Sequence, residues 1–163
     1  MISIIYPEGD YSSSDLAIRL QALAQSQGKN TIYVVPKHLG RNPEAIYKKL
    51  SKSSTALLLM HDKTGLDKGT EEEIRYLLGR SKNIHAILPS NVVLPKDIEK
   101  KINVLPYGGG TNKTFADIVQ ETVRQLEPKN GAKSESGNDF AVLLALLAMV
   151  ILFIGLSSDD GNK

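Results

Sequence analysis

The sequence predicts an α/β protein built on one parallel β-sheet, and three observations lead to that prediction. Five short segments are apolar almost throughout, which is typical of strands buried on both faces of a sheet. Segments in which apolar residues recur at helical spacing separate them along the chain. Prolines and glycines mark the boundaries between the two kinds of segment. Strands and helices that alternate in this way build a parallel sheet with helices on both faces.

The five predicted strands are short and are bounded by turn residues. In chain order they are ISIIY (2–6), TIYVV (31–35), TALLLM (55–60), NIHAILP (83–89) and INVLPY (102–107). Pro7 and Gly9 end the first strand and Pro36 ends the second, because these residue types interrupt a hydrogen-bonded ladder.

Apolar residues at helical spacing predict the segments between the strands. The residues from Ser12 to Asp15 offer N-caps for a first helix, which continues to Gly28. The other predicted helices are one with Pro43 in its first turn, one opened by Thr70, a short turn over 97–101 and a closing helix over 115–126.

Five strands and about four helices suit a flavodoxin-like strand order of 2-1-3-4-5. Right-handed crossovers send the first connection one way and the later connections the other way. The order therefore reverses between the first and third strands, and ligands of such sheets bind beyond the carboxyl ends of the strands at that reversal. The loops expected there are residues 7–13 and 61–70.

The composition restricts the chemistry. Lysine and arginine number 20 against 18 aspartates and glutamates, and the net charge of +2 gives no argument for a nucleic-acid partner. The absence of cysteine excludes disulfides and thiolate metal sites. The histidines at 38, 61 and 85 lack the spacing of metal ligands, so we predict no metal and no bound cofactor.

The segment FAVLLALLAMVILFIGL (140–156) has no polar side chain. As a helix it would span about 25 Å, at the short end of a bilayer crossing. A buried core helix is the alternative, but such a helix normally keeps a polar face. We therefore expect a soluble head (1–127), a flexible polar linker (128–139), a transmembrane helix (140–158) and a short polar tail (159–163).

Positive charges predict the orientation of this anchor. Arg124, Lys129 and Lys133 precede the apolar segment and only Lys163 follows it, so the head should face the cytoplasm of a single-pass, C-terminally anchored protein. Small residues at 141, 145, 148 and 155 form a stripe along which two such helices could associate. Lys37, Arg41, Lys48 and Lys49 are interpreted as a solvated basic face, with juxtamembrane lipid contact as the alternative.

Three consecutive glutamates stand in the stretch GTEEEIRYLL (69–78) beside the expected ligand edge. Thr70-x-x-Glu73 matches a capping box, in which Glu73 would bind the Thr70 amide. Glu71 and Glu72 would favour the positive end of the helix dipole. Helix capping therefore explains all three, while the edge location makes Glu73 a candidate for chemistry.

Four pieces of the sequence resemble Toll/interleukin-1 receptor (TIR) domains over about residues 1–126. They are SIIYPEGD, AIYKKLSKSSTALLLMHD, DKGTEEEIRYLLGRSKNIHAILP and GGGTNKTFADIVQETVRQL, and they follow in the order and spacing of prokaryotic TIR-like domains. In NAD⁺-cleaving members the glutamate before the isoleucine is catalytic, and the matching residue is Glu73. A carboxylate suits that reaction because cleavage of the nicotinamide–ribose bond builds positive charge on the ribose.

The resemblance and the loop positions together predict a nucleotide-binding set. Its members are Tyr6, Gly9, Asp10, Ser12, His61 and Gly69. The chain departs from the family at Gly69, where the enzymes often carry tryptophan, and at Ile5 and His61, where serine is common. Loss of the tryptophan would alter the adenine or nicotinamide pocket or remove it.

Three functions follow from these patterns. The first is a membrane-tethered TIR-like effector of prokaryotic antiviral defence that cleaves NAD⁺ when its heads cluster as homo-oligomers. The second is a non-catalytic TIR-like module that assembles, or binds a partner or nucleotide signal, at the membrane; Gly69 favours it. The third is a response-regulator-like receiver, which needs an aspartate at the end of the third strand, a position that Asp62 only approaches.

Overall fold

The computed structural model describes residues 1–26, 32–61, 65–109, 114, 117, 147 and 148. Its strands are β1 (Ile2–Ile5), β2 (Ile32–Val34), β3 (Thr55–Leu59), β4 (Asn83–Pro89) and β5 (Asn103–Tyr107). Its helices are α1 (Tyr11–Ser26), α2 (Pro43–Leu50), α3 (Lys68–Gly79) and α4 (Lys96–Glu99). Each predicted strand is found within one residue of its predicted bounds.

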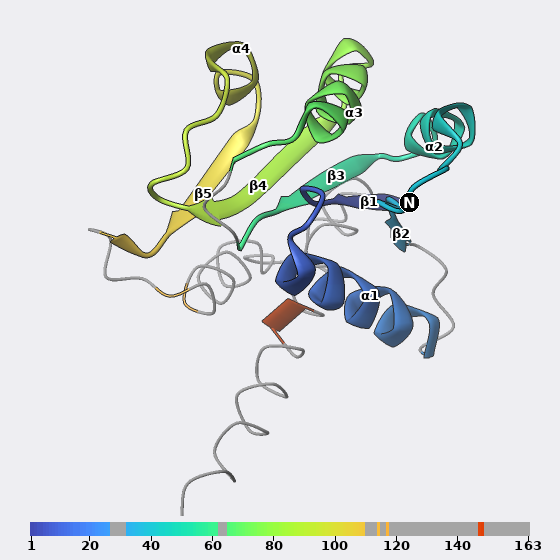
Figure 1. Ribbon diagram of the computed structural model, residues 1–163, viewed down its shortest axis with the longest axis horizontal. Helices are drawn as coiled ribbons and strands as arrows, with labels where there is room; N and C mark the ends of the chain where they lie inside the picture. Colours follow the sequence, from blue (N-terminus) through green and yellow to red (C-terminus); the bar gives the residue numbers. More distant parts are fainter. Residues whose placement is uncertain (27–31, 62–64, 110–113, 115–116, 118–146, 149–163) are drawn as a thin grey trace, which may run out of the picture.

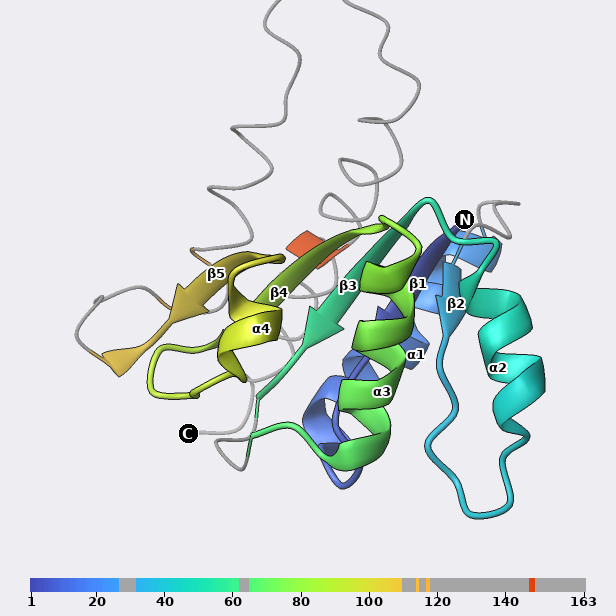
Figure 2. The same cartoon turned by 90° about the horizontal axis from the view of Figure 1, so that it is seen from above.

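The five strands form one parallel sheet in the order β2-β1-β3-β4-β5, which confirms the predicted fold class and strand order. Ile2 aligns with Ile32 on one side and with Thr55 on the other, and Thr55 aligns with Asn83. The strands therefore start together at one edge, called the amino edge below, and end together at the opposite, carboxyl edge. Helix α1 covers one face of the sheet, and α2, α3 and α4 lie on the other (Figures 1 and 2).

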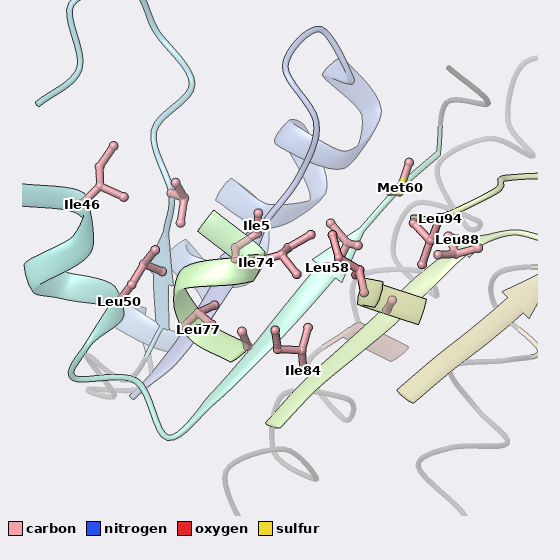
Figure 3. Packing of buried hydrophobic residues seen from close by; sticks show 14 residues of the cluster. Ile5, Ile46, Leu50, Leu58, Met60, Ile74, Leu77, Ile84, Leu88 and Leu94 are labelled. Carbon is pink, nitrogen blue, oxygen red and sulfur yellow. The ribbon is translucent and has the colours of Figure 1, made fainter. Parts of the chain in front are cut away.

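Each face of the sheet has its own apolar cluster, because successive strand residues point to opposite faces. Ile4, Leu57 and Leu59 pack with α1 in the first cluster. Ile5 and Leu58 pack with α2, α3 and α4 in the second cluster (Figure 3). This double burial explains why the strands are apolar at almost every position.

The starts of α1 and α3 differ from the prediction. Helix α1 begins at Tyr11, and Asp10 caps it by accepting a hydrogen bond from the Ser13 amide at 2.9 Å. Helix α3 begins at Lys68, and its N-cap is Asp67, which accepts from the Thr70 amide at 2.9 Å. The predicted capping box of Thr70 with Glu73 is therefore wrong, since Asp67 has already taken the Thr70 amide.

Several predicted segments lie outside the described residues. They are Asp62, most of the closing helix (115–126), the linker (128–139), the transmembrane helix (140–158) except Leu147 and Ala148, and the tail (159–163). Among the described residues, no helix has the length and apolar character needed to cross a membrane. Leu147 is completely buried in the first cluster, on the face that α1 covers.

Candidate functional site

The candidate site lies at the carboxyl edge, where β1 and β3 connect in opposite directions. The loop after β1 contacts the start of α3 there. The Glu8 amide donates to Asp67 Oδ2 at 2.8 Å, and the Thr70 hydroxyl lies 3.3 Å from the Tyr6 carbonyl oxygen. The predicted proximity of the first loop to the glutamate-bearing helix is thus present.

Glu73 is the centre of a buried ion cluster. Lys37 Nζ donates to one carboxylate oxygen and Arg41 Nη1 donates to the other, each at 2.6 Å. The Glu73 side chain is 3% exposed, that of Lys37 is 6% exposed and that of Arg41 is 22% exposed. Both oxygens therefore already have a cationic partner, away from water.

Further contacts tie this cluster to the start of α3. Lys37 Nζ also donates to the Thr70 hydroxyl at 2.8 Å, and that hydroxyl donates to Asp67 Oδ2 at 2.6 Å. Burial lowers the pKa of Lys37, although the charges of Glu73 and Asp67 oppose the change. Burial raises the pKa of Asp67, but hydrogen bonds from Thr70 and the Glu8 amide outweigh it and leave that pKa below its usual value. The cluster clamps the connection between β2 and α2 onto α3.

A second polar cluster lies at the same edge, on the side of α1. Asp10, 4% exposed, accepts hydrogen bonds from the Ser13 hydroxyl at 2.7 Å and from the His61 amide at 2.8 Å. Ser13 Oγ lies 3.2 Å from His61 Nδ1. The Tyr107 ring stands 6.1 Å from the His61 ring, and its hydroxyl donates to the Met60 carbonyl oxygen at 2.8 Å.

The polar groups of the second cluster are hydrogen-bonded to one another and are not arranged for catalysis. Burial lowers the pKa of His61 against the opposing charge of Asp10, so the imidazole is neutral at pH 7. Burial, with a smaller contribution from Asp10, raises the pKa of Tyr107 to about 12. Ser13 is completely buried and its hydroxyl proton is held by Asp10, so this serine is not an exposed nucleophile.

The structure divides the predicted site between these two clusters. The His61 backbone amide donates a hydrogen bond to Asp10, and Tyr6 and Gly9 belong to the loop between the two clusters. Gly9 has a positive φ of 86°, which a turn of this kind requires, and Ser12 is exposed in the first turn of α1. Glu73 does not join Asp10 but binds cations from the connection after β2.

Gly69 lies beside the ion cluster. A Cβ atom at this position would lie 2.6 Å from Arg41 Nη2 and 3.2 Å from Asp67 Oδ1. A side chain there would require the Arg41 guanidinium to shift. Glycine at position 69 therefore leaves room for the Arg41 guanidinium, which donates a hydrogen bond to Glu73.

Lys37, Arg41 and Tyr107 are the site residues that sequence reasoning missed. The interpretation of Lys37 and Arg41 as part of a solvated basic face is wrong, because both bind Glu73. One signal was present: both follow Pro36, which ends the second strand at the same edge as Glu73. Opposite charges at one edge of a parallel sheet are candidates for pairing. Tyr107 is the last residue of β5, so its position at the end of a predicted strand could have placed it at the same edge.

The fold and site define an α/β protein with two polar clusters at the carboxyl edge of a five-stranded parallel sheet. No model of a known protein family matches the chain, and no curated protein sequence is similar enough to it to count as a match.

Replacing Glu73 with glutamine should destabilise the fold by about 3 kcal/mol, because it leaves two largely buried cations without their counter-charge. Glu72→Gln is the matched control, since its side chain is 54% exposed and it should change stability by less than about 0.5 kcal/mol. Urea unfolding followed by circular dichroism measures both. Equal decreases in the free energy of unfolding of the two variants would contradict a clamping role for Glu73.

His61 should titrate below the ordinary histidine pKa of about 6.5 in an NMR experiment that resolves each imidazole. The pKa of His61 is lower in the folded state than in the unfolded state. The contribution of neutral His61 to stability is therefore complete above pH 6.5 and is lost as the pH falls toward the folded-state pKa. Burial depresses the pKa of His85 as well, so a bulk stability curve would merge the two. Asp10→Asn should lower the His61 midpoint further, and an increase would show that the charge of Asp10 does not act on this ring.

Proposed function

We propose that the chain is a membrane-attached, TIR-like binding and assembly module in which Glu73 has a structural role rather than a catalytic one. One observation carries the proposal: both oxygens of the Glu73 carboxylate are bound by cations at 2.6 Å, in a side chain that is 3% exposed.

This geometry conflicts with what NAD⁺ cleavage requires of a carboxylate. The reaction builds positive charge on the ribose, and the carboxylate must lie within contact distance of that charge. Lys37 and Arg41 already occupy those positions around Glu73. A ribose could approach only after at least one of the two cations had moved.

Gly69 supports the same conclusion. Tryptophan is common at the matching position of the TIR-like enzymes, and here a side chain would collide with the Arg41 guanidinium. The chain therefore has space for Arg41 where those enzymes have an aromatic group. The exchange is consistent with a head whose Glu73 holds the β2–α2 connection in place.

An exposed apolar residue on the clamped connection supports assembly or partner binding. Leu39 is 95% exposed, and Lys37 and Arg41 on either side of it are fixed to α3 through Glu73. A leucine displayed on a fixed loop loses little conformational freedom on binding, which favours its use as a contact. We place homo-oligomer contacts between TIR-like heads at this loop.

Membrane attachment rests on the apolar segment 140–156 and its flanking charges, with the head on the cytoplasmic side. Leu147 of this segment is buried against the face that α1 covers. Full insertion of residues 140–158 into a bilayer therefore requires Leu147 to leave the head.

A second candidate function is NAD⁺ cleavage by Glu73 on clustering, as expected of a prokaryotic defence effector. The location of Glu73 on the helix that follows the reversal of strand order favours it. Arg41, the more exposed of the two cations, is the group that a neighbouring head or a nucleotide phosphate would have to draw away.

The two functions separate in an NAD⁺ assay on the full chain, purified in detergent at high concentration. We expect no cleavage above the blank for the wild type or for Arg41→Ala, because Lys37 still covers Glu73 in that variant. Glu73→Ala and the control Glu72→Ala should be equally inert. Cleavage by the wild type, or by Arg41→Ala, that disappears when Glu73 is replaced would establish the enzyme instead.

Leu39→Asp should weaken self-association of the full chain by about tenfold or more, since a buried leucine contributes about 1.5–3 kcal/mol and a buried unpaired carboxylate adds a penalty. Sedimentation velocity over a concentration series measures the effect. Val93→Asp is the control, because Val93 is 87% exposed on a different connection. Self-association that is unchanged by Leu39→Asp would move the contact elsewhere.

A further inference from the structure

Seven basic side chains gather at the amino edge of the sheet. They come from the last turn of α2 and from the connections α2 to β3, α3 to β4 and α4 to β5. They are called the amino-edge cations: Lys48, Lys49, Lys52, Arg80, Lys82, Lys100 and Lys101. Six of them are exposed and Lys82 is half-buried.

The topology brings these three connections together. Each one leads from the end of a helix into the start of a strand, and the starts of β3 and β4 are in register through the pair Thr55 and Asn83. β5 begins beside His85, two residues into β4. All three helices lie on the same face of the sheet (Figure 2). The amino-edge cations therefore form one basic strip rather than three unrelated groups.

The strip differs in its pairing from the cations of the ion cluster and from Arg75. Lys37 and Arg41 are neutralised by Glu73, and Arg75 is paired with Glu71 and Asp97. Within the described ranges, none of the amino-edge cations makes an ion pair; Arg80 instead lies 4.8 Å from the centre of the Tyr76 ring. Asp97 of α4 is paired with Arg75 and also interacts electrostatically with Lys101, and Glu99 precedes Lys100 in the sequence.

We infer that the amino edge is a docking surface for anionic lipid headgroups, on which the head lies when the chain is attached to a bilayer. The inference rests on the proposed membrane attachment. Each lysine or arginine at an anionic leaflet strengthens binding, and a cluster of four to eight is the usual size of such a surface.

Lipid fits this strip better than nucleic acid does. Proteins that bind single strands combine basic grooves with aromatic platforms that are free to stack on bases. Here the Tyr76 ring already packs on the Tyr47 ring, with 4.6 Å between centroids, and lies 4.8 Å from the Arg80 guanidinium. Only the 12 residues 128–139 separate the head from the proposed anchor. An anchored head would thus meet headgroups at high effective concentration.

Docking of this edge would also orient the site. Leu39, the ion cluster and the cluster around His61 belong to the opposite, carboxyl edge. With the amino edge on the membrane, the carboxyl edge faces the cytoplasm, where a partner or a neighbouring head can reach Leu39.

Single cysteines provide the test, because the chain has none of its own. Ser54→Cys marks the amino edge and Asn91→Cys marks the carboxyl edge, and both positions are exposed. The full-length variants carry a thiol-reactive donor dye and are reconstituted into phosphatidylcholine vesicles, with or without 30% phosphatidylserine, that contain an acceptor dye on the headgroups. Energy transfer should be stronger from position 54 than from position 91 on the anionic vesicles.

The difference should disappear on neutral vesicles and in high salt, because screening removes the attraction. Neutralising Lys48, Lys49 and Lys52 to glutamine should reduce the equilibrium constant between docked and undocked heads on the order of a hundredfold. Lys68→Gln, a fully solvated lysine at the start of α3, is the control and should change nothing. Equal transfer from both positions, or a difference that does not depend on phosphatidylserine, would overturn the inference.

Co-sedimentation separates this result from a failure of the anchor. A chain that does not sediment with neutral vesicles lacks the proposed anchor, and the strip is then tested directly by sedimentation with phosphatidylserine vesicles. If the wild type binds phosphatidylserine vesicles and the triple glutamine variant does not, the docking surface is supported. If the wild type does not bind them, the docking surface is refuted. Stronger binding of an oligonucleotide than of these vesicles would assign the strip to nucleic acid and refute it equally.

Discussion

The buried carboxylate of Glu73 is the constraint on which the carboxyl edge depends. A carboxylate removed from water must have its charge balanced nearby, or it destabilises the fold by several kcal/mol. Lys37 and Arg41 supply that balance, and Asp67 acts on Lys37 in turn, so that two cations face two carboxylates. Because Asp67 also caps α3 and binds the Glu8 amide, the cluster joins the loops that follow β1, β2 and β3.

The same constraint sets what the site can do. A catalytic carboxylate needs one open side, and Glu73 has both oxygens occupied. Any state in which Glu73 acts on a substrate must find another anion for Lys37 or Arg41, or expose them to water. The phosphates of a nucleotide would be such anions, so substrate binding and release of Glu73 would be linked. Release of Glu73 would then depend on an event outside the isolated head.

Sequence patterns were sufficient for the sheet and insufficient for the ion cluster, for a physical reason. Consecutive apolar residues such as TALLL predict a buried strand, and the right-handedness of crossover connections then fixes the strand order. The cap of α3 is different, because Asp67 and Thr70 are both good N-cap residues within three positions. The choice between them also involves the Glu8 amide, 59 residues away along the chain. The pairing of Glu73 with Lys37 likewise spans 36 residues, and no local pattern encodes it.

The unequal charge of the two edges follows from the direction of the helices. In this parallel fold α1, α2 and α3 begin at the carboxyl edge, where the positive end of the helix dipole favours Asp10, Glu44 and Asp67. The helices end at the amino edge, where the negative end favours lysine and arginine. Helix capping alone would give any such protein some polarity. In this one the polarity is stronger, because Lys37 and Arg41 near the carboxyl edge are bound by Glu73, while most of the amino-edge cations face solvent. The ion cluster thus binds two cations near the carboxyl edge, while the basic strip at the amino edge, opposite the loop that carries Leu39, stays without ion pairs among the described residues.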